Sequence, residues 1–485
     1  MFRFILVLAL FVTSFSQSEF IKSSNLMNTV KYLASEELNG RLGGSEGYFK
    51  AANFIADEFS KLNLLPFKDA SYFQTFNVEY NEIVPPYSLD LITNDGVIKE
   101  YKLGDDFVFR GFTGSGNFAA EVVFAGYGIS APEIGYNDYE GINVDGKVVM
   151  VFKENPRWKI DEHNWPERNP RPKSKVAAEH GAKGILFVSF PNDENPREPI
   201  GSVLHGSGEQ MENFPQLHIE LNVADDLFKH SGYTLAELQT KIDSEHKPFS
   251  IELNKKLKVV VNAKYKKDRE TVNVIGIYPG TDEELKDEYV ILGAHLDHVG
   301  GQADEIYFPG ANDNASGSAA VLEIARVFAE QRIQTKRSIM FVLFSNEESG
   351  LEGADFLANN LPIPKENITA MLNMDCIAHG DSIRLGNGKS AVELWTIAKQ
   401  IDKQNANMTV DATWSGGGAD ATPFHNIGIP SLYFVTTNSY THLHSTTDKP
   451  GTLNPDLFKE ITKLALNTLY EVSNGNYLRE KLATK

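Results

Sequence analysis

The spacing of apolar residues changes along this chain and predicts two kinds of structure. Near the N-terminus, Tyr48, Ala52, Ile55, Phe59 and Leu62 recur at helical spacing, which predicts a helix with one face against a core. After Lys255, short apolar runs alternate with helical stretches. The runs are VNVIGIY, YVILGAH, SIMFVLFS, AMLNMD and SLYFV, and the helices include SGSAAVLEIARVFAEQ, AVELWTIAKQ and DLFKEITKLALNTLYEV. This alternation predicts an α/β fold, with a mostly parallel central sheet and helices on both faces.

The middle of the chain has a different pattern. Residues 85–255 contain short β-rich runs such as LDLITND, AEVVFAGYG and KVVMVF, which turn signals separate. One helix-strand unit, SKVAAEHGAKGILFV, interrupts them. We therefore expect a discontinuous α/β domain, residues 17–84 and 256–485, with an inserted β-rich domain at residues 85–255.

The first 16 residues have the features of a secretory signal peptide. Arg3 is followed by an apolar run, and Ser14 and Ser16 provide the small-x-small pattern of a cleavage site. The run is shorter than the roughly 20 residues of a membrane span, and no later segment reaches that length. We expect an exported protein, periplasmic or extracellular, without a membrane span; a buried N-terminal strand is the alternative.

Charge and cysteine content narrow the possible functions. The 485 residues carry a formal net charge of −19, which argues against nucleic-acid binding because phosphates require a basic surface. An acidic protein attracts cationic ligands instead, such as the protonated N-terminus of a peptide. Cys376 is the single cysteine and follows an apolar run, so a buried structural role is favoured over a nucleophile.

Potential metal ligands follow several of the predicted strands, where open α/β sheets bind ligands. The run YVILGA ends in His295 and Asp297, which point the same way because strand residues alternate. His295 could bind a metal while Asp297 accepts the other N–H of its ring. His298 is expected to have a structural or outer role.

Carboxylates occur at the next two positions along the chain. Asp313 lies in GANDNASG, where a turn opens a helix, and it could bridge two cations or simply cap the helix as Ser316 or Asn314 could. The run SIMFVLFS leads into Glu347 and Glu348. One of these acids could bind a metal while the other acts as a base on metal-bound water; a solvated turn is the alternative.

The last candidates lie toward the C-terminus. The run AMLNM ends in Asp375, and YTHLHSTTD contains His442, His444 and Asp448, the last placed to partner His444. Two histidines and three carboxylates, with one spare glutamate, suit zinc ligation. Two ions roughly 3.5–4 Å apart could share Asp313 and activate one water molecule, which predicts a binuclear hydrolase.

Five ordered motifs resemble the co-catalytic di-zinc aminopeptidases, whose superfamily includes glutamate carboxypeptidase and the transferrin-receptor ectodomain. They are GAHLDHVG, GANDNASGSAAVLEIAR, FSNEESGLEGA, LNMD and HSTTD, preceded by KYLASEELNGRLGGSEGYFKAANFIADEF. The resemblance implies two Zn²⁺ per chain, peptide substrates and a cis peptide after the bridging aspartate. It assigns His295 and Asp375 to one zinc, Glu348 and His444 to the other, Asp313 as the bridge, Glu347 as general base and Asp297 as orienting acid.

The same resemblance extends to the inserted segment and leaves alternatives open. AGYGI, YNDYEGINVDGKVVMV and AAEHGAKGILFV are similar to the protease-associated domain that this family often carries. The HLH spacing makes His442 a rival to His444, although the following S-T-T-D favours His444. The expected activity is removal of the N-terminal residue of a peptide. Alternatives are a carboxypeptidase or dipeptidase, a glutaminyl cyclase, or a non-catalytic binding protein of the transferrin-receptor kind.

Overall fold

The chain divides into two compact units. The computed structural model describes residues 18–68, 70–93, 96, 98–165, 170–205 and 208–482, so the expected signal peptide at residues 1–16 lies outside them. Unit 1 consists of the chain up to Val78, Asp268–Gly300 and Phe308–Lys485, and unit 2 of Glu79–Lys267 and Gly301–Tyr307. The second unit therefore begins before residue 85, ends after residue 255 and includes a short later segment that the sequence did not indicate.

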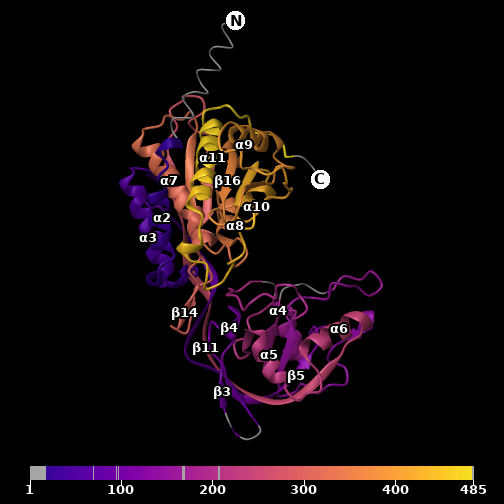
Figure 1. The fold of residues 1–485 in the computed structure, drawn as a ribbon. Coiled ribbons are helices and arrows are strands. Elements are labelled where there is room, and N and C mark those ends of the chain that lie inside the picture. Colours follow the sequence, from indigo (N-terminus) through magenta and orange to yellow (C-terminus); the bar gives the residue numbers. More distant parts are fainter. Residues whose placement is uncertain are drawn as a thin grey trace. The chain divides into compact units, whose positions relative to one another are not determined.

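Unit 1 is built on one mixed sheet (Figure 1). Its strands, in spatial order, are β17 (Ile383–Gly386), β18 (Ser431–Thr436), β16 (Ile368–Met374), β12 (Tyr289–His295), β15 (Ser338–Phe344) and the C-terminal part of β11 (Ser250–Tyr278). The four central strands are parallel, whereas β17 and β11 pair antiparallel at the two sides. This arrangement confirms the predicted α/β class with its mostly parallel sheet.

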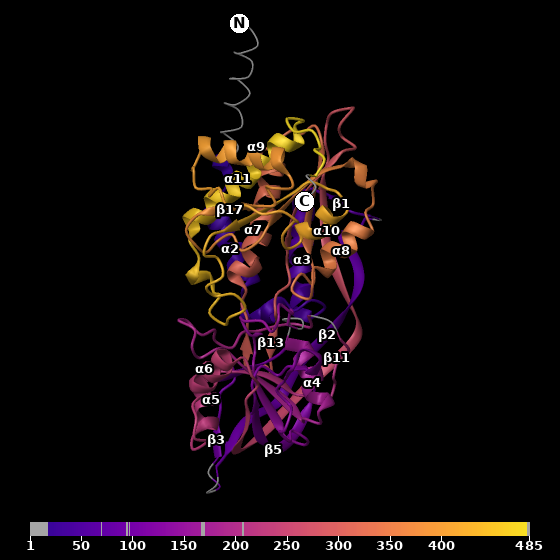
Figure 2. The same cartoon turned by 90° about the vertical axis from the view of Figure 1, so that its right-hand side faces the viewer.

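Helices cover both faces of this sheet, as expected (Figure 2). Side chains of five helices pack into the same buried cluster on one face: α2 (Ser23–Leu33), α3 (Glu46–Lys61), α7 (Gly317–Glu330), α9 (Val392–Gln404) and α11 (Pro455–Ser473). The opposite face packs against α8 (Glu352–Asn359) and α10 (Ala421–Asn426). The strands are apolar on both faces because both faces are covered.

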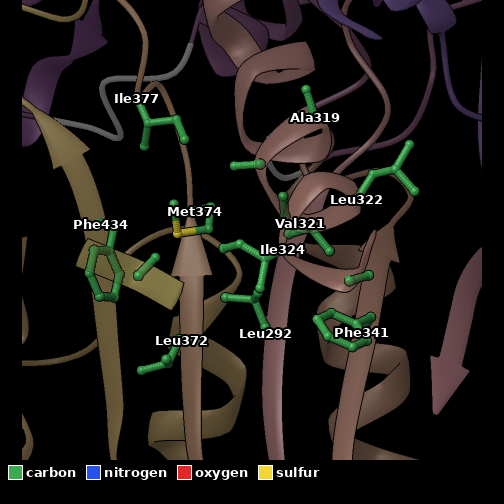
Figure 3. Close-up of a cluster of buried hydrophobic side chains, with 14 of the residues drawn as sticks. Leu292, Ala319, Val321, Leu322, Ile324, Phe341, Leu372, Met374, Ile377 and Phe434 are labelled. Atoms are coloured by element: carbon green, nitrogen blue, oxygen red, sulfur yellow. The ribbon is translucent and has the colours of Figure 1, made fainter. Parts of the chain in front are cut away.

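The centre of the larger cluster fixes the strands that end at the candidate ligands (Figure 3). Leu292 of β12 and Leu372 of β16 lie beside Val321 and Ile324 of α7, and all four are fully buried. Burying a side chain of this size contributes about 1.5–3 kcal/mol. Helix α7 is thereby held against strands β12 and β16 whose carboxyl ends carry polar residues.

Unit 2 also contains a largely parallel sheet. Its order is β4 (Phe107–Phe109), β10 (Gln216–Ile219), β9 (Gly184–Val188), β8 (Val148–Phe152), β5 (Gly116–Ala125) and the N-terminal part of β11. Its helices are α4 (Pro170–Glu179), α5 (Leu221–Phe228) and α6 (Leu235–Glu245). Only the first was anticipated. Helix α6 begins with a capping box between Thr234 and Glu237, a signal visible in the sequence.

The remaining strands lie outside these two strand orders. They are β1 (Leu65–Pro66), β2 (Phe73–Ile92), β3 (Ile98–Glu100), β6 (Ser130–Ala131), β7 (Tyr136–Asn137), β13 (Gly301–Gln302) and β14 (Ile306–Tyr307). Within the described ranges, no helix is both long and apolar enough to cross a membrane.

Candidate metal centre

The predicted ligands converge on Asp313. His295 ends β12, and its Nε2 atom lies 3.3 Å from Asp313 Oδ1 and 3.4 Å from Asp375 Oδ1. From the other side, His444 Nε2 lies 2.8 Å from Glu348 Oε2 and 3.3 Å from Asp313 Oδ2. Each oxygen of the Asp313 carboxylate therefore faces a different histidine, which is the arrangement that a carboxylate shared by two cations requires.

The two remaining histidines of the motifs, His442 and His298, have different surroundings. His442 uses Nδ1 to contact Thr447 Oγ1 at 2.8 Å, and its ring packs edge-on against His379. His298 is completely buried, and its Nδ1 lies 2.7 Å from Glu348 Oε1. Glu348 thus has His298 on one oxygen and His444 on the other. His298 can orient this carboxylate by donating a hydrogen bond, which fits the outer role expected for it.

Asp297 fixes the two adjacent glutamates through their backbone. Its carboxylate accepts the N–H of Glu347 at 3.1 Å and that of Glu348 at 3.4 Å. The ring Nδ1 of His295 lies 3.2 Å from the carbonyl oxygen of Asp297 but 3.7 Å from its carboxylate. The carbonyl therefore offers the shorter contact to the His295 ring, where the sequence suggested the carboxylate.

Asp448 supports the loop that carries Asp313, and it does not pair with His444 as the sequence suggested. Its buried carboxylate accepts the backbone N–H of Asn312 at 2.9 Å and that of Asp313 at 3.1 Å. The sequence does not reveal these partners, because the donating groups are main-chain amides more than 130 positions away.

The loop that carries Asp313 directs the Asp313 carboxylate toward the other candidate ligands. The next residue, Asn314, caps the following helix. The Asp313–Asn314 peptide bond is cis, as the family resemblance implied. Asn314 Oδ1 accepts the Gly317 N–H at 2.8 Å, while its Nδ2 donates to Met374 O at 2.9 Å. Asn314, and not Asp313, therefore caps the start of α7 and also ties the loop to the end of β16.

A buried arginine that the sequence analysis did not single out connects the ligand loops. Arg41 is completely buried and donates from Nε to Leu296 O at 2.8 Å, and from its terminal nitrogens to Pro309 O at 2.9 Å and Gly310 O at 3.1 Å. It also bonds to Leu33 O. Leu296 follows His295, and Gly310 precedes Asp313 by three residues, so one guanidinium group holds both loops.

Electrostatics within the cluster favour ionised acids beside protonated imidazoles. Burial alone would raise the pKa of Glu348, as would Asp313, but His444 and His298 outweigh them and lower it to about 2. Burial would lower the pKa of His444, yet Glu348 and Asp313 raise it to about 10. The pKa of His295 is raised well above its usual range by the surrounding carboxylates, against the effect of burial. Divalent cations bound here would take the place of these protons.

Glu347 has the opposite character to its neighbour. Burial raises its pKa well above the usual range; the charges of Asp420, Glu348 and Asp375 add to this, although His295 opposes it. Its Oε2 atom lies 3.9 Å from His295 Nε2. A carboxylate at the cluster with a raised pKa is suited to accept and return a proton.

Two further residues near the centre escaped the sequence analysis. Tyr433, inside the apolar run of β18, donates from its hydroxyl to Asp375 Oδ2 at 2.9 Å. Asp420 is completely buried and its carboxylate oxygens have no hydrogen-bond partner among the described residues. Burial raises its pKa well above the usual range, and Asp375, Asp297 and Glu348 add to the effect while His295 opposes it. The motif GADATPF offered the only signal for Asp420.

The donor set fits metal ions. His295, Asp313 and Asp375 form one group whose ligand atoms lie close enough to share an ion, and His298, Asp313 and Glu348 form another. Asp375 Oδ1 is buried without a hydrogen-bond donor among the described residues, as expected for an atom reserved for a cation. Mixed imidazole and carboxylate ligation is typical of zinc.

Residues 273–469 match the model of peptidase family M28. The matched range includes all the candidate ligands and Glu347.

Solved structures with this fold extend over nearly the whole chain. An aminopeptidase from Aneurinibacillus sp. strain AM-1 is 19% identical, with 97% of this chain and 98% of that chain covered and a TM-score of 0.66. A zinc aminopeptidase from Bacillus subtilis is also 19% identical, with 95% and 98% covered and a TM-score of 0.67. At this identity the likeness shows the fold alone.

Curated relatives match a shorter part. A probable leucine aminopeptidase of Arthroderma otae is 28% identical over 212 residues, which is 42% of this chain and 58% of that protein. Leupeptin-inactivating enzyme 1 of Streptomyces exfoliatus is 29% identical over 210 residues, covering 42% and 44%. Transferrin receptor protein 2 of Mus musculus is 22% identical, covering 80% and 49%. The chain thus spans little more than half the length of the first of these relatives.

Proposed function

We propose that this protein is a two-zinc aminopeptidase that hydrolyses the N-terminal peptide bond of peptides. The observation that carries the proposal is the position of Asp313, with one oxygen toward His295 and the other toward His444. His295 and Asp375 would hold one zinc, His444 and Glu348 the other, and Asp313 both. The names of the relatives, which include aminopeptidases and a zinc aminopeptidase, support the same activity.

The roles of the surrounding residues follow from their contacts. Bound zinc ions supply polarisation of the scissile carbonyl and a lowered pKa of a water molecule. Glu347 accepts a proton from that water at its carboxylate and returns it to the departing amine, for which its raised pKa is suited. Asp297 keeps Glu347 and Glu348 in place through their amide hydrogens.

Charge at the site favours a free N-terminus over a free C-terminus. Asp297, Asp313, Glu347, Glu348 and Asp375 contribute five negative charges against four from two zinc ions, so a cationic amine is accepted. A carboxypeptidase would need an arginine or lysine to grip the terminal carboxylate. Arg41 lies near the charges of Asp297 and Asp313, but its N–H groups already donate to main-chain carbonyls. Arg41 is therefore not available to bind a terminal carboxylate.

The test compares three substrates on the zinc-loaded protein. An aminoacyl chromogenic substrate should be cleaved, whereas its N-acetylated form and an N-blocked peptide with a free C-terminus should be poor substrates. Preference for either blocked compound would overturn the aminopeptidase assignment while leaving the two-zinc hydrolase intact.

We also propose that the protein is exported through residues 1–16, on the signal-peptide features of the sequence. N-terminal sequencing of the mature protein should begin close to residue 17. A mature protein that retains Met1 would contradict export through a cleaved signal.

A further inference from the structure

Four polar side chains lie on one face of the unit 2 sheet, at neighbouring strand positions. Lys153 follows β8 and Ser189 follows β9, while His218 belongs to β10 and Arg110 follows β4. The backbone ladder continues through the flanking positions, because Lys153 N–H donates to Val188 O and Arg110 N–H donates to Gln216 O, each at 2.9 Å. The residues that alternate with these four, Phe152, Val188, Leu217, Ile219 and Phe109, all pack in one cluster on the opposite face.

His218 and Ser189 both have hydrogen-bond partners. His218 is completely buried, and its Nε2 lies 3.3 Å from Ser189 Oγ, which donates to Arg197 O at 2.6 Å. Its Nδ1 accepts the N–H of Ile200 at 3.4 Å. Burial and the nearby cations lower the pKa of His218 well below its usual range, so the ring is neutral and adds no charge.

The nitrogen atoms of Lys153 and Arg110 are not all paired by hydrogen bonds in this way. Lys153 is 7% exposed, and no described residue forms a hydrogen bond or an ion pair with its Nζ atom. Arg110 is 6% exposed, its guanidinium lies 5.4 Å from the centre of the Phe112 ring, and it donates one hydrogen bond to Ile200 O at 3.2 Å. Its buried Nε has no hydrogen-bond partner among the described residues. Buried charges are normally paired, because removing an ion from water costs several kcal/mol.

The charges around this pair repel more than they attract. Burial, then Arg110 and the exposed Arg197, lower the pKa of Lys153 to about 7, and Glu154 opposes this shift. Burial and Arg197 lower the pKa of Arg110 to about 10, again against Glu154. Around this buried pair, Arg197 adds a third positive charge from an exposed position, and Glu154 supplies the opposing negative charge.

We propose that Arg110 and Lys153 form a binding site for a small oxyanion, a carboxylate or a phosphate group, in unit 2. Such an anion can accept hydrogen bonds from the unpartnered nitrogens of both side chains and offset their mutual repulsion. Each side chain keeps a small exposed fraction, so solvent reaches the cluster. The site is independent of the peptidase proposal, since its residues lie outside the M28 range.

The experiment titrates the full-length zinc-loaded protein with inorganic phosphate and, separately, acetate, at constant ionic strength set with NaCl. Isothermal titration calorimetry should show saturable binding to the wild type that is at least tenfold weaker in Lys153→Met. Lys175→Met is the matched control, because Lys175 belongs to α4 of the same unit and its side chain is 71% exposed. Anion binding at the metal centre is common to all three proteins and cancels in the comparison. The arm with the higher affinity identifies the phosphate or the carboxylate as the preferred ligand.

A second measurement covers the case in which the titration is ambiguous. Without added anion, Lys153→Met should unfold at a higher temperature than the wild type, because the substitution removes an uncompensated buried charge; phosphate or acetate should close this gap. A far-UV circular-dichroism spectrum equal to that of the wild type establishes that the variant is folded, and Lys153→Gln replaces it if it is not. Identical isotherms for the wild type and Lys153→Met, or no binding to either, would overturn the proposal.

Discussion

Adjacent residues in this protein can have opposite chemical properties. Glu347 and Glu348 both have their amide N–H groups on the carboxylate of Asp297, yet one pKa is raised and the other lowered. The difference arises because Glu348 has an imidazole on each oxygen, whereas Glu347 is buried near other carboxylates. A sequence with two consecutive glutamates contains no signal for this division.

Substitution of each glutamate by glutamine should separate their roles. Glu347→Gln should lower kcat by about 10²–10⁴-fold while the two proposed zinc ions remain bound, because the lost group is the proposed general base. Glu348→Gln should release one zinc, because the lost group is a proposed ligand. Metal analysis and turnover should be measured on both variants, and equal zinc loss in the two would contradict the assignment.

Lys153 should make the stability of unit 2 depend on pH in an unusual direction. Its pKa is about 7 in the folded protein and 10.5 without the shift, so between these values the unfolded chain binds the extra proton. Stability then rises with pH through this window and falls toward pH 7, where the buried amine is charged.

The comparison is between the wild type and Lys153→Met in urea unfolding at several pH values. Their difference in free energy of unfolding should move in favour of the wild type as pH increases from about 7 to about 10. Lys173, whose pKa burial also lowers to about 7, is present in both proteins and drops out. A difference that is independent of pH would show that Lys153 keeps an ordinary pKa.

At the scale of elements, the ligand loops depend on a tight segment near the N-terminus. Asn39, Gly40 and Arg41 all have left-handed backbone conformations, and His298 and Gly300 donate their N–H groups to Arg41 O and Gly40 O. This crossing brings the loop after β12 against the segment that carries the Arg41 guanidinium. Close backbone approach, together with the Arg41 hydrogen bond to Leu296 O, therefore positions the His295 loop.

Gly40→Ala tests this crossing. A Cβ atom at Gly40 would lie 2.3 Å from Gly300 O and 2.7 Å from Phe308 O, so the loops must separate. Gly428→Ala is the control, because its φ of +87° is also left-handed but nothing lies within 4 Å. Gly40→Ala should lower the free energy of unfolding by about 1–3 kcal/mol more than the control. It should also weaken zinc binding, and equal behaviour of the two variants would contradict the argument.

The sequence predicted elements better than contacts. The runs that became β12, β15 and β16 were recognisable because strands covered on both faces are continuously apolar, and their ends identified His295, Glu348 and Asp375. The partners of Asp448 and Arg41 could not be predicted, because they are main-chain groups brought close only by the fold. Tyr433 was hidden because it occupies an ordinary apolar run.

At the scale of the whole molecule, metal binding should be coupled to protonation. His295 and His444 have raised pKa values among the carboxylates, so zinc has to displace their protons. Adding zinc to chelated protein near pH 7 should release roughly two protons per chain at saturation with two ions.

Proton release is measured in weak buffer with an indicator dye, alongside metal analysis and activity. The thermal transition of unit 1 should also move upward on zinc addition, since an ion that binds the folded state stabilises it. Full activity after exhaustive chelation, or zinc uptake without proton release, would be incompatible with this centre.

The seven residues Gly301–Tyr307 affect which segments must be deleted to produce unit 1 alone. They belong to unit 2, where Gln302 exchanges hydrogen bonds with the backbone of Phe109, and Ala303 donates to Ile83 O. A gene for unit 1 alone therefore needs two excisions, Glu79–Lys267 and this second segment. The second is simple to close, because Phe308 N–H already donates to Gly300 O at 3.0 Å. A single deletion would leave a hairpin without its sheet only three residues after His298. A shortened enzyme made with both excisions is thus the version in which zinc binding and cleavage of small substrates should survive.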